Sequence, residues 1–425
     1  MATSGAETFR HDPAENFSLG KNQPADISHR FRHELDSIFG PPPIADRRLS
    51  GNDKTTAPEK GGRSIGDFAR ENGLDSKPAP DKKLELSLQY NGEKLVIGRV
   101  PDSPDGLKEI KKDLKEFTDL KQWELENKYG IKIARPGEPG PRQQIVQKDN
   151  SIKFGKELAV RNPSLKELLG MEAALEKSAP ANTSGNAKEP VKFYFLKDQS
   201  YNPEARGAAA FEPDINGGPA VIVDPGFDRN PITERDRKNN DGSDHGSMES
   251  ILTHELGHHT EEKLLKTPEA KSAFYKELGW RPVPGSQPGQ EEYMLRGRHG
   301  DYKPINPMDP EAGWEKLNRH GRTTGIVNQD QVAADALVKP ATGYFVQPHE
   351  MLAESLTLLR LGNNHRSHLL NTDPRLHNLI KGLDQKEIDM KHGRGRMIRS
   401  FSGALVPNTP DNQRLLLEKE KQYRR

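Results

Sequence analysis

Residues 247 to 265 read SMESILTHELGHHTEEKLL and place His254, Glu255 and His258 in the order His-Glu-x-x-His. In a helix, the two histidines leave the same face one turn apart, so both imidazoles can reach one metal ion. Glu255 lies about 100° further round the helix, where it can contact a water molecule on the metal without being a ligand. The pattern therefore indicates one half of a zinc hydrolase site, rather than an exposed helix that happens to be rich in His and Glu.

A hydrolytic zinc site needs a third protein ligand, and the stretch GYFVQPHEMLAESLTLLRLGN at residues 343 to 363 offers one. Its leucines recur at helical spacing, which predicts an amphipathic helix. Glu350 and Glu354 fall on one face of this helix, one turn apart. We expect Glu350 to bind the metal and Glu354 to accept the free N–H of His254 or His258, which fixes the tautomer of that ring.

Several other residues remain candidates for the third metal ligand. The form of the motif with a third His six residues after the second is absent, because position 264 is Leu. We rank the alternatives below Glu350, because none combines a long amphipathic helix with a second carboxylate one turn on. They are Glu311 with Glu315, which have Gly313 between them, and Asp330, Asp335 and His349. The remaining histidines, expected on loops or surfaces, are His299, His320, His365 and His368.

The segments ILTHELGHHT (251–260) and HEMLAES (349–355) together resemble the gluzincin class of zinc peptidases. The Glu-x-x-Ala-Glu form is most similar to the catalytic domain of the anthrax lethal factor type. This resemblance implies that His254, His258 and Glu350 bind zinc, that Glu255 is the general base, that Glu354 stands behind the ligands, and that Tyr344 steadies the oxyanion.

Two points of the resemblance stay open. Tyr293 and Tyr302 are alternatives to Tyr344 for the oxyanion role. The similarity covers at most residues 190 to 362, and His258 and Glu350 are 92 positions apart (350 minus 258), so we expect an inserted subdomain between them.

The composition narrows the class of protein. With 64 basic and 63 acidic residues the formal charge is +1, which provides no global field for nucleic acid or an anionic membrane. The absence of Cys excludes thiolate ligands, so a metal must be held by His and carboxylates, and it fits a reducing compartment. No segment approaches the roughly 18 apolar residues of a membrane span, and the N-terminus lacks the apolar run of a signal peptide. We therefore expect no nucleic acid partner, no membrane span and no conventional signal peptide.

The order of the patterns predicts an α+β fold. Residues 83 to 100 alternate Leu with polar residues around an Asn91-Gly92 turn, which indicates a hairpin, and residues 103 to 129 have helical spacing. Residues 131 to 134 are a candidate third strand of this ββα module. Buried strands at 191 to 196 and 220 to 225 and a helix at 164 to 178 precede the histidine-bearing helix.

Four domains follow from these patterns. The third is expected to have a zincin-like metallopeptidase fold, with a small mixed sheet and the active-site helix in one half and helices in the other. The domains are a disordered leader at 1–80, the ββα module with a linker at 81–150, the metallopeptidase domain at 151–400 and a polar C-terminal tail at 401–425.

The function expected from this reading is that of a zinc-dependent endopeptidase acting on a protein or peptide, with Glu255 as general base for a metal-activated water. A second hypothesis is a protein-binding module that keeps a zinc ion for stability only. By analogy alone, a solvated leader beside a toxin-like catalytic domain suggests a bacterial toxin or effector. Such a protein would be cytoplasmic, or exported without a conventional signal peptide.

Overall fold

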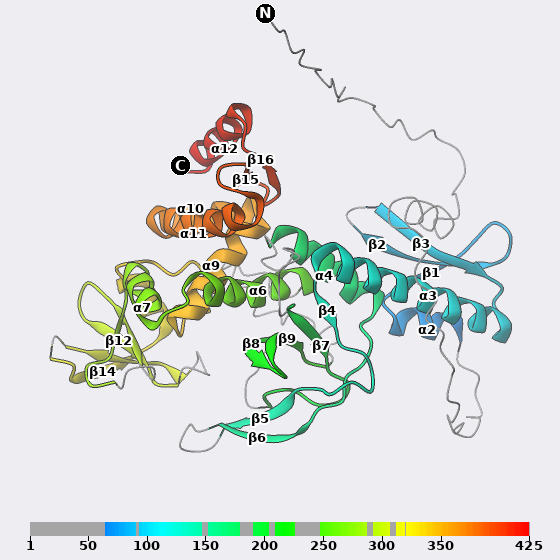
Figure 1. The fold of residues 1–425 in the computed structure, drawn as a ribbon, viewed down its shortest axis with the longest axis horizontal. Coiled ribbons are helices and arrows are strands. Elements are labelled where there is room, and N and C mark those ends of the chain that lie inside the picture. Colours follow the sequence, from blue (N-terminus) through cyan, green and yellow to red (C-terminus); the bar gives the residue numbers. More distant parts are fainter. Residues whose placement is uncertain are drawn as a thin grey trace, which may run out of the picture. The chain divides into compact units, whose positions relative to one another are not determined.

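A computed structural model describes most of the chain beyond residue 63, and Figure 1 shows its fold. The chain divides into two compact units, Met1–Asp113 and Leu114–Arg425, so the main division lies between the two boundaries expected at residues 80 and 150. The described residues are 64–90, 93–146, 152–178, 190–203, 209–225, 247–286, 292–306, 312–318 and 320–424.

The first unit contains a three-stranded antiparallel sheet in the order β1-β2-β3. Strands β2 (Leu84–Tyr90) and β3 (Glu93–Val100) form the hairpin predicted over residues 83 to 100. The expected turn residues Asn91 and Gly92 lie outside the described residues. Leu86 is fully buried, as the alternation of apolar and polar residues requires.

Part of the disordered leader expected over residues 1 to 80 has regular secondary structure. Helix α2 (Ile65–Glu71) begins after the Ser64 cap, and strand β1 (Asp75–Pro78) pairs with β2. Ile65 and Phe68 are buried, so apolar contacts stabilise this short segment within a stretch that is polar on average. Residues 1 to 63 of the expected leader lie outside the described residues.

The second unit is built on a four-stranded mixed sheet in the order β4-β7-β9-β8. The first three of these strands run parallel, and β8 is antiparallel to β9 at the edge. Residues 131 to 134, expected in the ββα module, instead supply β4, because their partner is β7 and not the hairpin. The strands are β4 (Lys132–Ile133), β7 (Lys192–Phe195), β8 (Ala209–Ile215) and β9 (Gly218–Val223).

Two helices cover one face of this sheet. They are α4 (Leu165–Lys177), which a capping box between Ser164 and Glu167 starts, and α6 (Met248–Leu264), the histidine-bearing helix. Leu252 and Leu256 of α6 are buried against apolar side chains of α4, β7 and β9. The helix predicted upstream is α3 (Pro104–Tyr129).

The opposite face of the sheet meets a two-stranded arm formed by β5 (Arg142–Val146) and β6 (Ile152–Glu157). Leu158 and Val160, which follow the arm, pack on the buried side chains of this face. Residues 136 to 144 were expected to be a linker, but from Arg142 onward they pair with β6.

A subdomain is inserted between the two site helices. It is a five-stranded antiparallel sheet in the order β10-β11-β12-β13-β14, preceded by α7 (Pro268–Glu277) and followed by α8 (Gln329–Asp335). Trp280 and Trp314 are fully buried in a core that also contains Leu352 and Leu356. The strands are β10 (Trp280–Pro282), β11 (Tyr293–Arg296), β12 (Asp301–Pro304), β13 (Trp314–Leu317) and β14 (Thr323–Val327).

The C-terminal part of the second unit is helical. The polar tail expected at residues 401 to 425 contains a strand and a helix, and Glu420 of that helix accepts a hydrogen bond from the buried Arg366 at 2.7 Å. The elements are α9 (Pro348–Leu361), α10 (Asn363–Thr372), α11 (Pro374–His392), β15 (Met397–Arg399), β16 (Leu405–Pro407) and α12 (Pro410–Tyr423).

The mixed α+β class predicted from the sequence is confirmed by these elements. Within the described part of the chain, no helix is long and apolar enough to cross a membrane.

Candidate metal centre

Helices α6 and α9 pack side by side (Figure 1). Three of their polar side chains come together. His254 Nε2 lies 3.1 Å from His258 Nε2 and 3.1 Å from Glu350 Oε2. His258 Nε2 lies 3.5 Å from the same Glu350 oxygen. The three atoms are therefore mutual neighbours. Among the described residues, His254, His258 and Glu350 are the one set of three or more such side chains that could hold a metal ion, and we refer to them as the metal group.

The spacing of these three atoms fits a tetrahedral zinc site. Ligands at about 2.0–2.1 Å from zinc in tetrahedral directions lie about 3.3 Å from one another. The three separations in this group run from 3.1 to 3.5 Å. Two imidazoles and one carboxylate also form a common ligand set for catalytic zinc, which keeps a fourth position open. The residues present thus fit a zinc ion.

Glu354 stands behind the group. Its Oε1 lies 2.8 Å from His254 Nδ1, on the side of the ring that faces away from Glu350. A proton held on Nδ1 by this carboxylate leaves Nε2 with a free lone pair, as a metal ligand requires. Glu354 is almost fully buried, so packing fixes the position of its carboxylate.

His254 and Glu350 have pKa values that are shifted in opposite directions. Burial lowers the pKa of His254, but Glu350 and Glu354 outweigh it, and the pKa lies well above its ordinary value. Burial raises the pKa of Glu350, but His258 and His254 outweigh it, and the pKa lies well below its ordinary value. The group is therefore organised around opposite charges, and a bound cation would take the place of the imidazole protons.

Glu255 is buried on α6 next to these ligands. Burial raises its pKa, and the nearby His254 and His258 offset that rise only in part. The backbone N–H of Phe211 on β8 donates a hydrogen bond to its carboxylate. A carboxylate with a raised pKa beside three candidate metal ligands is in the position that a general base would need.

Tyr344 lies in the loop before α9, with its ring centroid 6.0 Å from that of His254. The negative charge of Glu350 raises the pKa of Tyr344, so the hydroxyl keeps its proton and can donate a hydrogen bond. The two alternative tyrosines lie elsewhere. Tyr293 packs against Tyr275, and the Tyr302 hydroxyl donates to Asp335 at 2.7 Å.

The alternative third ligands are placed as follows. His349 is close, with Nε2 at 3.4 Å from Glu350 Oε1 and its ring 5.5 Å from that of His258. Asp335 accepts hydrogen bonds from His299 and Tyr302, on a different surface. The remaining alternatives are Glu315, which lies on strand β13 and not on a helix, Asp330, which lies in the exposed first turn of α8, and Glu311, which lies outside the described residues.

The other histidines expected on loops or surfaces do not join the metal group. His299 contacts Asp335, and His368 Nε2 lies 2.6 Å from the backbone oxygen of Ala341. His320 lies on an exposed turn, and His365 lies in the first turn of α10.

Strand β8, which touches the site through Phe211, was missed in the sequence. Pro213 makes the segment AAFEPDI look unlike a strand. However, Asn216 and Gly217 between β8 and β9 both have positive φ, at 53° and 90°. This Asn-Gly pair is the same hairpin signal that predicted the turn at Asn91-Gly92, and it could have located β8.

A buried network of charged side chains joins α6, α9 and α11. Arg360 on α9 is fully buried and donates to Asp384 at 3.0 Å and to Glu387 at 2.6 Å, both on α11. It also donates to Thr260 Oγ1 of α6 at 3.0 Å. One guanidinium thus ties together the two helices that carry the metal group and the helix behind them.

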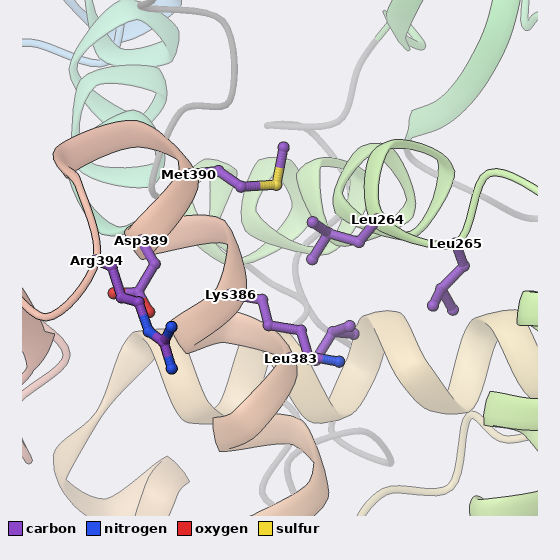
Figure 2. A pocket seen from close by; sticks show the side chains of 7 residues that line it. All are labelled: Leu264, Leu265, Leu383, Lys386, Asp389, Met390 and Arg394. Carbon is purple, nitrogen blue, oxygen red and sulfur yellow. The ribbon is translucent and has the colours of Figure 1, made fainter.

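A cavity of about 450 Å³ lies between the end of α6 and α11 (Figure 2). Leu264 and Leu265 line it on one side and Leu383 and Met390 on the other. None of the metal group residues lines this cavity. The candidate chemistry is therefore carried by the α6–α9 contact and not by this cavity.

Comparison of the chain with protein-family models, with curated proteins and with solved structures finds no match.

Proposed function

We propose that this protein is a zinc-dependent endopeptidase of the gluzincin type, with a zincin-like catalytic domain in its second unit. The observation that carries the proposal is the convergence of His254 Nε2, His258 Nε2 and Glu350 Oε2, with Glu354 behind His254 and Glu255 one residue along α6. The carboxylate contact to His254 favours a catalytic metal site with ordered ligands over a chance cluster.

The edge strand supports a peptide as the substrate. β8 ends the sheet in the described part of the chain, so the backbone groups of its outer edge other than the Phe211 N–H, which Glu255 accepts, can pair with an extended peptide. Phe211 of this strand reaches Glu255, which places the edge beside the proposed base. A peptide added to β8 would therefore pass the metal group with its backbone already aligned.

The residues of the site have distinct roles in the proposed reaction. When bound, zinc supplies a Lewis acid that acidifies a water molecule and polarises a carbonyl group. Glu255 takes the proton of the attacking water and later delivers it to the leaving amine. Tyr344 donates a hydrogen bond to the oxyanion that develops on the carbonyl oxygen, and Glu354 keeps His254 in the tautomer that exposes Nε2.

The first test is metal-dependent peptide cleavage. The full chain should bind roughly one zinc ion and should cut a peptide library in a reaction that a chelator stops and added zinc restores. Glu255→Gln should keep the zinc and the fold but lose cleavage, and a fully active Glu255→Gln protein would refute the mechanism. Absence of cleavage by the zinc-loaded wild type, with zinc needed only for folding, would favour the binding module.

The second test separates the ligand from its neighbours. Glu350→Ala should lower the zinc content sharply, whereas Glu315→Ala, which removes a carboxylate from β13, should not. Tyr344→Phe should leave zinc bound and lower kcat by about 10²-fold, the size seen when one oxyanion donor is removed. Unchanged zinc content in Glu350→Ala would assign the third ligand to another residue, with His349 the nearest alternative.

A further inference from the structure

The two faces of strand β8 meet different parts of the second unit. Phe211 points toward α6, where its ring packs 5.6 Å from that of His259. The next residue, Glu212, points to the opposite face, because successive side chains of a strand alternate. Its partner on β9 is Ala220, which belongs to the buried cluster on the arm side of the sheet.

The carboxylate of Glu212 is held by neutral donors. Gln144 Nε2 on β5 donates to Glu212 Oε1 at 2.8 Å, and the Tyr201 hydroxyl lies beside the same carboxylate. Among the described residues, no Lys, Arg or His forms an ion pair with Glu212. Burial raises the pKa of Glu212, and the two donors offset this rise only in part. This half-buried carboxylate is oriented by its neighbours and lacks a positive charge opposite it.

The arm adds an apolar surface next to this carboxylate. Gln144 of β5 pairs directly with Phe154 of β6, so the two side chains lie on the same face of the arm. Phe154 is 51% exposed, and Ile152, two residues earlier on the same face, is 53% exposed. Phe154 and Ile152 are therefore exposed to solvent on one face of the arm. The same face carries Gln144, which contacts Glu212.

We propose that Glu212 and the face of the arm formed by Ile152 and Phe154 make a subsite that selects a lysine or arginine side chain of the peptide substrate. This inference rests on the proposed peptidase function, since it takes the substrate to be an extended peptide on the free edge of β8. Alternate side chains of such a peptide point to the α6 face and to the arm face. A long side chain on the arm face would lay its methylene stem on Phe154 and bring its cationic head to Glu212.

The test uses pairs of peptides that differ at one position. A peptide that the wild type cleaves is made with lysine or with norleucine, which keeps the stem but lacks the charge, at each position in turn. At one position the wild type should prefer lysine in kcat/KM by about tenfold or more, the size expected for a partly desolvated charge pair. Glu212→Gln should bring that ratio near one, and Glu212→Lys should invert it, so that the norleucine peptide is preferred.

Direct binding provides a readout that does not depend on turnover. In the Glu255→Gln background, the Kd of the lysine peptide should rise about tenfold when Glu212→Gln is added, while that of the norleucine peptide should change little. Phe154→Ala should weaken both peptides to a similar extent, because it removes the surface for the stem and not the charge. Since about half of the Phe154 side chain is exposed, we expect this variant to keep its fold.

The outcomes separate the subsite from the peptidase. A zinc-loaded wild type that cleaves no peptide contradicts both the peptidase and the subsite. Cleavage without a preference for lysine at any position, or a preference that persists in folded Glu212→Gln, overturns the subsite and leaves the peptidase standing.

Discussion

Gly257 on α6 lies directly against Ala353 on α9, so the two helices that carry the metal group are in close contact at this glycine. A Cβ atom built at Gly257 would come within 3.1 Å of Ala353 Cα and 3.3 Å of its Cβ. The two residues belong to the motifs His-Glu-x-x-His and Glu-x-x-Ala-Glu, so both motifs contribute a small residue as well as ligands. Their contact sets the distance over which the imidazoles of α6 meet Glu350 of α9.

Gly257→Val should separate the two helices. The added methyl groups overpack this contact, which we expect to cost about 1–3 kcal/mol of unfolding free energy and to weaken zinc binding. Urea denaturation and chelator competition measure the two effects. The control is Gly382→Ala in α11, where a Cβ meets nothing within 4 Å and should stabilise the helix by about 0.5–1 kcal/mol. Equal stability of Gly257→Val and the wild type would show that the close contact is not required.

Glu354→Gln should weaken zinc binding without unfolding the protein. The amide has the shape of the carboxylate but does not hold the proton on His254 Nδ1 with a full negative charge. Loss of such a partner lowers metal affinity by roughly 10- to 100-fold, which competition with a chelator of known affinity can measure. Glu350→Ala, which removes a ligand, should lower the zinc affinity further than Glu354→Gln does. Unaltered affinity in Glu354→Gln would remove Glu354 from the site.

Arg360→Met should destabilise the protein strongly. The substitution leaves Glu387 buried without its cationic partner, and such losses cost about 3–5 kcal/mol. Arg414→Met is the control, because the ion pair of Arg414 with Asp411 is largely exposed and contributes at most about 1 kcal/mol. Denaturation midpoints compare the two variants. A similar midpoint for both would mean that the buried network does not fasten the site helices.

The stability of the C-terminal helices should fall in mild acid because of His377. Arg366 Nε donates to His377 Nε2 at 3.2 Å, so the ring must be neutral in the folded protein. Burial and the charge of Arg366 lower the pKa of His377 to about 4. The unfolded chain, with an ordinary His pKa near 6.5, binds a proton first, so stability is complete above pH ~6.5 and is lost as the pH falls toward ~4.

The measurement is the unfolding free energy from pH 7 to pH 4 for the wild type and for His377→Gln. The amide oxygen can still accept the Arg366 hydrogen bond but does not titrate. The difference between the two proteins isolates His377 from the other titrating groups, and we expect it to change by on the order of 3 kcal/mol over this range. A difference that stays constant with pH would contradict the assignment of a neutral His377.

Local patterns were enough to predict the two helices that carry the candidate metal group. The i, i+4 spacing of His254 and His258, and of Glu350 and Glu354, depends only on helix geometry, which the chain specifies over short distances. The hairpin at β2 and β3 was found for the same reason, since alternation and an Asn-Gly pair are local signals. These patterns led to the α+β class and to the residues of the candidate metal group.

Only the tertiary structure decided which distant segments meet. The inserted sheet β10–β14 separates the two motifs in sequence, yet the buried surface around Trp280 and Trp314 packs on α9 and holds Glu350 against α6. The pairing of residues 132–133 with β7 and the contact of Gln144 with Glu212 likewise depend on long-range packing. The sequence determined by itself which residues share a helix face, because that periodicity is local. Which elements pack against each helix face depends on the burial of apolar surface across the second unit. A short sequence pattern does not contain that information.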